Sequence, residues 1–197
     1  MEALKDKLES SFLVFENELN GEGEGPIHTR RREAFERFVK SGFPTKRDEE
    51  WKYTNLKPVL KPDFRVFVND ENTVDFSSIK RFFLNDVDTY KLVFIDGYYS
   101  SWLSETTHQG FDICTFSNML TKYKDVAEQY FGKALPENEA MASVNTAFAR
   151  EGAFIRIKRN VTVDKPVEII FITTDHGVAT LAQPRNLVVV EENAEIT

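Results

Sequence analysis

Short apolar stretches separated by turn residues fill the last quarter of this chain, and they constrain its fold more than any other feature. From about residue 153 one stretch follows another, ending with Leu187–Val190 and Glu195–Thr197. This pattern is typical of β-strands in a sandwich, a barrel or a β-helix. The strands continue to the last residue without a closing helix, and an unpaired apolar strand edge is unfavourable in water. We therefore expect the sequence to be the front part of a longer protein.

The expected strands carry apolar residues at alternating or consecutive positions, with Asn, Asp, Gly or Pro between them. They are Ile155–Ile157, Val161–Val163, Val167–Phe171, Val178–Leu181 and Leu187–Val190. Ile155 and Ile157 alternate with Arg156 and Lys158, so both isoleucines are expected to point inward. The absence of a six-residue repeat argues against a left-handed hexapeptide β-helix.

Two helices with a linker between them are predicted at the N-terminus. One apolar stripe recurs every three or four residues and consists of Leu4, Leu8, Phe12, Phe15 and Leu19. Gly21–Pro26 supplies a flexible linker, and a second helix is expected over 29–41. We expect Arg30, Arg31 and Arg32 to be solvated in its first turn rather than to contact a phosphate, because glutamates accompany them.

The stretch from 64 to 148 is predicted to be mixed. Phe64, Val66 and Val68 alternate as in a short strand. Leu92–Ile95 and Tyr98–Tyr99 flank Asp96–Gly97, a pair that is typical of a β-hairpin turn. Two more helices are expected, one from Ser117 as its N-cap to a stop at Gly132, the other over 141–148 and closed by Gly152.

The composition weighs against several classes of function. The net charge of -7 is unfavourable for binding nucleic acids or anionic membranes. No apolar run is long enough to span a bilayer, and the N-terminus lacks the pattern of a signal peptide. Cys114 is the only cysteine, which excludes an internal disulfide and fits a reducing compartment. We therefore expect a cytoplasmic location.

Familiar catalytic and metal-binding motifs are absent from the sequence, including the phosphate loop and the nucleophile elbow. His28, His108 and His176 lie in turn-like sequence. His108, Asp112 and Cys114 would share one side of an extended segment, but they match no metal-site spacing, so we expect Cys114 to be a buried apolar residue. The sequence predicts no catalytic, cofactor-binding or metal-binding residues, and it favours a role in binding or assembly.

Trp51 and Tyr53 stand out in the polar segment 44–62. Large aromatic side chains among charged residues are expected to anchor an irregular loop against the N-terminal helices. The alternative is that the pair is exposed and forms a hot spot of a protein interface.

Several stretches resemble the SufD family, the scaffold subunits of the Suf iron–sulfur cluster assembly system. Residues 42–56, which include Glu-Trp-Lys-Tyr-Thr, resemble the family's N-terminal signature. The stretches 145–152, 166–169 and 184–194 look like the entry into its β-helix core, and 92–103 is similar to the strand and turn that precede it. The resemblance touches most of the chain in the right order.

The resemblance implies an N-terminal helical region, a right-handed parallel β-helix and a C-terminal helical region. It implies pairing with a SufB-like protein, or with a second copy, and binding of a SufC-like ATPase, mostly through regions beyond Thr197. The SufC-like partner would hold the ATP. The residues that handle the nascent cluster would also lie beyond Thr197, so the resemblance assigns no ligand to this chain.

The sequence thus predicts an α+β chain with a mainly helical region over 1–150, a hairpin near 92–100, and the start of a right-handed parallel β-helix over 151–197. We expect a scaffold rather than an enzyme, with self-association through the edge at 187–190. The alternative is the front piece of a β-helix enzyme acting on carbohydrate, which would carry carboxylates on neighbouring turns. Beyond Thr197 such an enzyme would continue in strands, whereas the scaffold would end in helices.

Overall fold

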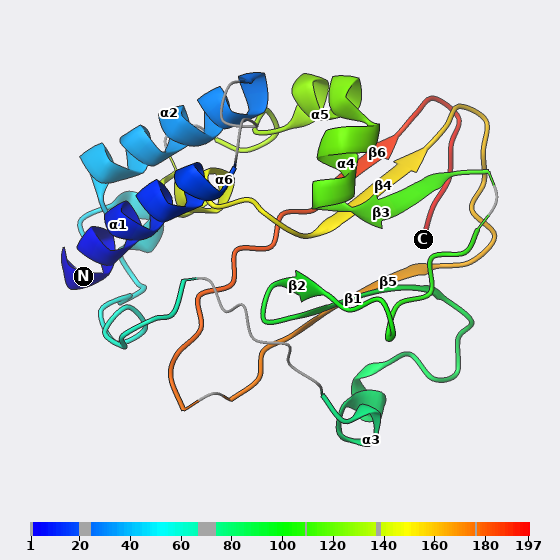
Figure 1. Cartoon of the computed structure of the whole chain (residues 1–197), viewed down its shortest axis with the longest axis horizontal. Helices are drawn as coiled ribbons and strands as arrows, with labels where there is room; N and C mark the ends of the chain where they lie inside the picture. Colours follow the sequence, from blue (N-terminus) through cyan, green and yellow to red (C-terminus); the bar gives the residue numbers. More distant parts are fainter. Residues whose placement is uncertain (1, 20–24, 67–73, 109, 137–138, 176) are drawn as a thin grey trace. The chain divides into compact units, whose positions relative to one another are not determined.

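The computed structural model describes residues 2–19, 25–66, 74–108, 110–136, 139–175 and 177–197. In this part of the chain, helices and two three-stranded sheets form an α+β fold (Figure 1). The chain divides into two compact units. Unit 1 comprises Met1–Phe67, Asp125–Ala149 and His176–Gln183, and unit 2 comprises Val68–Lys124, Arg150–Asp175 and Pro184–Thr197.

Unit 1 is built around a core rich in phenylalanine. Its helices are α1 (Glu2–Glu18), α2 (Pro26–Ser41), most of α5 (Lys124–Tyr130) and α6 (Ala140–Ala147). The stripe predicted for the first helix is confirmed, since α1 buries Leu4, Leu8, Phe12 and Phe15. Phe148 follows α6, and its ring centroid lies 5.6 Å from that of Phe12 and 5.8 Å from that of Phe35. These aromatic contacts join three helices that are far apart in sequence.

Two of the arginines predicted to be solvated instead bind backbone carbonyls in unit 1. Arg31 is 3% exposed, and its Nη2 donates to the carbonyl oxygen of Ala149 at 2.6 Å. Arg30 Nη1 donates to the carbonyl oxygens of Glu128 and Phe131 at 2.7 and 3.0 Å. The prediction was wrong because both side chains reach the carboxyl ends of α5 and α6, where the last carbonyls of a helix lack intrahelical donors.

The single helix predicted from Ser117 to Gly132 is two helices, α4 (Phe116–Lys122) and α5. The N-cap is Thr115, whose hydroxyl accepts from the backbone N–H of Asn118 at 3.1 Å. Tyr123 interrupts the helical backbone, and its hydroxyl donates to Asp112 at 3.0 Å. A tertiary contact therefore overrides the local helical periodicity here.

One sheet of unit 2 contains the predicted hairpin. Its strands, in spatial order, are β2 (Tyr98–Tyr99), β1 (Tyr90–Ile95) and β5 (Val167–Ile172). Asp96 and Gly97 have φ angles of 50° and 90°, which confirms the turn between β1 and β2. β5 runs parallel to β1, with Tyr90 opposite Val167. Before β1 the chain forms the short helices α3 (Phe76–Ile79) and η2 (Lys80–Phe82).

The other sheet of unit 2 contains the strands β3 (Asp112–Thr115), β4 (Ala153–Ile157) and β6 (Leu187–Val190), in that order. Ile155 and Ile157 are buried as predicted. The strand expected over Val161–Val163 is reduced to an isolated bridge between Thr162 and Glu195, which run parallel. The stretch 178–181 likewise forms only a bridge, from Thr180 to Arg65 in unit 1.

A repeating offset of 33 residues relates the later strands of unit 2. Asn186 Oδ1 accepts from the backbone N–H of Ala153 at 2.8 Å, and Asn160 Oδ1 accepts from Asn193 Nδ2 at 3.2 Å, with 33 residues between the partners in both pairs. Asn160 and Asn193 also share a left-handed backbone, with φ angles of 62° and 57°. Two successive passes of the chain therefore place equivalent turns one above the other.

Gly152 permits a close approach of two backbones rather than closing α6, as its position had suggested. Its φ is +148°, and a Cβ atom at this position would overlap the backbone of Arg185. The backbone N–H of Arg185 donates to the carbonyl oxygen of Glu151 at 2.8 Å. Only glycine combines this conformation with this contact.

The units differ in outline from the predicted split at residue 150. The chain does pass between units at Ala149 and Arg150, but Val68–Lys124 belongs with the later strands because β1 pairs with β5. Most of the predicted linker Gly21–Pro26, His176 and Val68 lie outside the described residues. Among the helices that the structure describes, none combines the length and apolar character needed to cross a membrane.

Candidate functional site

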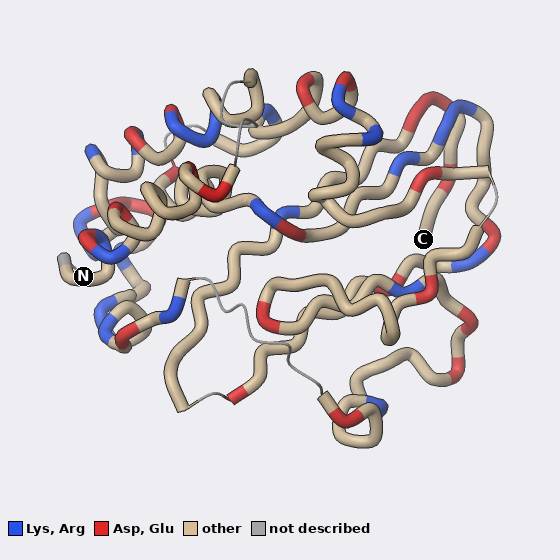
Figure 2. The backbone as a smooth tube through the Cα atoms, viewed as in Figure 1, with Lys and Arg blue, Asp and Glu red and all other residues tan. Residues whose placement is uncertain are grey.

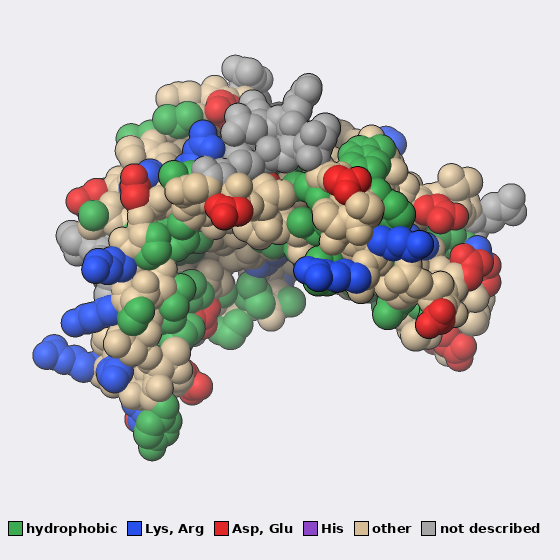
Figure 3. All heavy atoms as spheres, turned by 90° about the horizontal axis from the view of Figure 1, so that it is seen from below, with side chains coloured by type: hydrophobic (Ala, Val, Ile, Leu, Met, Phe, Trp, Pro, Cys, Tyr) green, Lys and Arg blue, Asp and Glu red, His purple; other side chains and the backbone are tan. Residues whose placement is uncertain are grey.

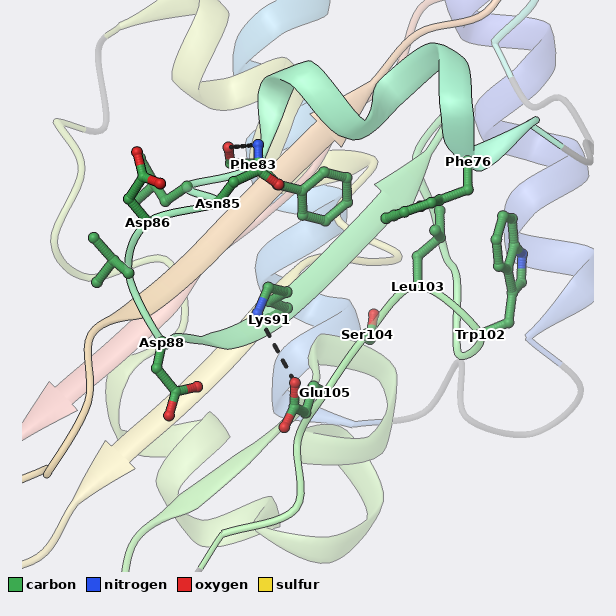
Figure 4. A pocket seen from close by; sticks show the side chains of 12 residues that line it. Phe76, Phe83, Asn85, Asp86, Asp88, Lys91, Trp102, Leu103, Ser104 and Glu105 are labelled. Carbon is green, nitrogen blue, oxygen red and sulfur yellow. Dashed lines mark hydrogen bonds and ion pairs between the residues drawn. The ribbon is translucent and has the colours of Figure 1, made fainter.

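A groove of unit 2 lies beside η2 and β1 and has a volume of about 790 Å³ (Figure 4). The exposed part of its lining is mixed. It contains four apolar side chains, Phe76, Leu84, Val87 and Trp102, and four polar or charged ones, Asn85, Asp86, Asp88 and Glu105. Phe83 and Leu103 are buried and form its floor. Exposed apolar side chains that gather around one hollow are typical of a surface that binds another molecule.

Hydrogen bonds to β5 fix the wall of this groove. Glu168 accepts from the backbone N–H of Leu84 at 2.9 Å and from the hydroxyl of Thr89 at 3.1 Å. The ring centroids of Phe76 and Phe83 lie 5.7 Å apart, so α3 also packs against the same wall. The groove is thus a preformed feature of unit 2.

The charged side chains at the rim of the groove are largely paired. Lys91 Nζ lies 3.9 Å from Glu105, and Asp88 lies 2.7 Å from Lys165 Nζ. Figure 4 shows the first of these pairs lying across the groove below the aromatic rings. Three of the four charged side chains that line the groove are thus in ion pairs.

A second candidate surface is the Trp51 loop, which we define as residues 44–63 in unit 1. Asp48 organises its start by accepting from the backbone N–H and the hydroxyl of Thr45 at 2.7 and 3.0 Å, and these bonds lower the pKa of Asp48. The short helix η1 (Glu49–Trp51) follows. Leu60 is buried in the core of unit 1 and holds the other end of the loop.

The structure contradicts the anchoring role predicted for Tyr53. Its side chain is 91% exposed, and Lys52 Nζ lies 5.2 Å from the centroid of its ring. Trp51 is partly buried. The prediction was wrong because Leu56 and Leu60, rather than the two aromatic residues, fasten the loop to the core. Exposure of Tyr53 agrees with the alternative, an interface residue.

The residues of the weak metal-site pattern have separate environments. His108 packs on Phe111, with ring centroids 4.2 Å apart, and burial lowers the pKa of His108. Asp112 accepts from Tyr123 and lies 3.7 Å from Lys158 Nζ. Cys114 is partly rather than fully buried, since it alternates with buried Ile113 along β3. In the described ranges, no group of three or more His, Cys, Asp or Glu side chains is placed to hold a metal ion.

His28 has a structural environment that its turn-like sequence did not reveal. It lies within α2, is buried, and its Nε2 lies 2.9 Å from Glu16 Oε1. Burial lowers the pKa of His28, although the hydrogen bond to Glu16 acts in the opposite direction. Its environment is that of a core histidine between α1 and α2.

The groove of unit 2 was missed at the level of sequence. Phe76, Leu84, Val87 and Trp102 follow neither a helical nor an alternating period, so no pattern marked them as a set. A signal was present nonetheless, since large apolar residues in a polar stretch without periodicity are good candidates for a surface cluster.

Comparison with known proteins places these features in a family. Residues 4–169 match the family described as SufBD protein N-terminal region. An iron–sulfur cluster assembly SufBD family protein of Synechocystis is 28% identical over 181 residues, which are 91% of this chain and 40% of that protein. The chain therefore spans less than half the length of this relative. Because the family match covers most of its residues, the chain belongs to the SufBD family.

Proposed function

We propose that this chain is a non-catalytic scaffold segment in iron–sulfur cluster assembly, acting in a complex of the SufBCD type. The family match over residues 4–169 carries the proposal, and the name of the Synechocystis relative, an iron–sulfur cluster assembly protein, supports it. The two surfaces described above also suit a scaffold, since both are exposed and neither presents an activated nucleophile. Because a chain with a single cysteine fits a reducing compartment, we still expect a cytoplasmic location.

We further propose that residues from about 153 begin a right-handed parallel β-helix. The parallel pairs β4–β6 and Thr162–Glu195 support this architecture. The stacked turns at Asn160 and Asn193 support it as well, because successive coils of a β-helix repeat the same turn at the same height. Its later coils and the main contacts with SufB-like and SufC-like partners would lie beyond Thr197.

The proposal is tested by co-purification of the full-length protein with SufB-like and SufC-like proteins from the same source. We expect a stable complex whose ATPase activity belongs to the SufC-like subunit and which gains iron and sulfide on anaerobic reconstitution. A full-length protein that joins neither partner would refute the scaffold role. Hydrolysis of a polysaccharide by the isolated protein would favour the carbohydrate enzyme instead.

The 197-residue chain itself is predicted to bind neither ATP nor a stable iron–sulfur cluster. Clusters are held mostly by several thiolates, whereas Cys114 is the only cysteine and burial raises the pKa of its thiol to about 11. The measurement is iron and sulfide content after anaerobic reconstitution, together with ATP titration by calorimetry. A stoichiometric content of iron and sulfide in the parent chain, lost in the Cys114→Ser variant, would contradict the prediction.

The edge strand β6 is predicted to make the 197-residue chain self-associate. Among the described strands β6 pairs with β4 alone, and Val188 and Val190 are each 47% exposed. An apolar edge strand readily pairs with another chain. Sedimentation velocity should therefore show concentration-dependent association that Val188→Lys/Val190→Lys reduces. If the parent chain stays monomeric at high concentration, β6 does not mediate self-association.

A further inference from the structure

We propose that the Trp51 loop is a docking surface for an acidic face of an assembly partner, with Tyr53 as its central contact. The inference goes beyond the proposed function, which places the main partner contacts after Thr197. It rests on that function for the identity of the partners to be tested. Three properties of the loop carry it, namely its unpaired positive charge, its exposed apolar contacts and its rigidity.

The loop presents cations whose charge is not neutralised by the described residues of unit 1. Two of its four carboxylates are in ion pairs, since Glu49 pairs with Lys52 and Asp63 lies 2.5 Å from Lys7 Nζ, and Asp48 is hydrogen-bonded to Thr45. By contrast, the structure gives no ion pair within the described residues to the side chains of Lys46, Arg47, Lys57 and Lys61. Figure 2 marks the positions of Lys and Arg along the backbone. These cations contrast with the net charge of the whole chain, which is -7.

Three of these cations meet at one cleft. Lys46, Arg47 and Lys57 line a hollow of about 480 Å³, together with Pro44, Thr45, Asn55 and Leu56. Residues on both sides of η1 therefore contribute to a single basic surface. Such a concave basic surface complements a protruding acidic segment, and complementary charge raises the rate and the specificity of association.

Exposed apolar side chains on the same loop supply contacts that charge alone does not give. Tyr53 is 91% exposed and Val59 is 62% exposed. Tyrosine and arginine are the residue types most enriched at the energetic centres of protein interfaces, together with tryptophan. Figure 3 shows Lys and Arg side chains projecting beside hydrophobic ones on one face of the molecule. A surface of this kind fits a protein better than a simple anion.

The loop is held in one conformation before any partner arrives. Its backbone bonds include Asp48 N–H to Thr45 O at 3.0 Å, Thr54 N–H to Trp51 O at 2.9 Å and Leu60 N–H to Leu56 O at 2.9 Å. Leu56 and Leu60 pack on the core of unit 1. A preformed loop loses little conformational entropy on binding, so its contacts convert more fully into affinity.

The test uses the full-length protein and purified SufB-like and SufC-like partners, with affinity measured by calorimetry at low and moderate salt. Lys46→Glu/Arg47→Glu and Tyr53→Ala are the test variants, and all three side chains are exposed. The matched control is Lys122→Glu/Lys133→Glu, which changes two exposed lysines by the same amount of charge and lies outside both the Trp51 loop and the lining of the groove. Circular dichroism checks that every variant is folded.

We expect each test variant to weaken binding to one partner about tenfold or more, and the control to stay within about twofold. The affinity of the parent should fall with salt, and that of Lys46→Glu/Arg47→Glu should depend on salt less. Equal affinity of all variants for a partner that the parent binds would overturn the inference while leaving the proposed function intact. Absence of any binding by the parent would refute the proposed function, and the inference with it. Salt-dependent binding of RNA in place of either protein would also overturn the inference.

Discussion

Replacement of Arg31 by alanine is expected to lower the free energy of unfolding by about 3 kcal/mol. The side chain is almost fully buried, and it donates to the carbonyl oxygen of Ala149 at the end of α6. Its guanidinium carbon also lies 5.3 Å from the ring centroid of Phe15 and 5.9 Å from that of Phe131. The substitution leaves the carbonyl without this donor and removes packing from three elements at once. Urea unfolding followed by circular dichroism measures the loss.

The neighbouring Arg32 provides the control for this experiment. Its side chain is 53% exposed, and its Nε donates to Glu16 at 2.5 Å. An exposed ion pair contributes at most about 1 kcal/mol, so Arg32→Ala should be nearly neutral. If the two variants lose the same stability, Arg31 does not have the buried, bonded environment described here.

The second large effect is expected for Gly152→Ala, which should lower the free energy of unfolding by about 3 kcal/mol or more. A φ of +148° is accessible essentially to glycine alone, and the added methyl group would overlap the backbone of Arg185. A clash with backbone is costly because no side-chain rotation relieves it. The strands that flank this contact, β4 and β6, should separate or shift.

Gly110→Ala is the matched control in unit 2. Gly110 also has a positive φ, of +93°, but an added Cβ would meet only a methyl carbon of Val161 at 4.0 Å. The strain of the backbone alone should cost about 1 kcal/mol. Thermal unfolding of both variants separates the two contributions, and a Gly152→Ala protein as stable as Gly110→Ala would mean that the close approach to Arg185 is absent.

Local patterns predicted those parts of the fold that depend on local chemistry. The apolar stripe of α1, the Asp96–Gly97 hairpin and the inward Ile155 and Ile157 all follow from periodicity or from turn preferences, and the structure confirms them. The parallel partner of β1 was not predicted, because no local pattern indicates which distant strand supplies its hydrogen bonds.

The errors arise where a distant group decides the environment of a residue. The charge of Arg31 suggested solvent, but the free carbonyls beyond α6 provide a buried partner for it. Tyr53 was expected to be buried because it is aromatic, yet Leu56 and Leu60 already fasten the loop. The sequence therefore shows that Tyr53 and Trp102 are present, but it does not indicate that Tyr53 is exposed or that Trp102 lines a groove.

The pairing of β1 with β5 also has a consequence for synthesis of the protein. β1 ends at Ile95, whereas its parallel neighbour begins at Val167. At roughly 5–20 residues per second, a ribosome leaves β1 without that neighbour for several seconds. During this interval the apolar side chains of Leu92 and Phe94 lack the cover that they have in the finished unit. We expect nascent chains halted between these two strands to bind ribosome-associated chaperones, and chains extended past Ile172 to release them.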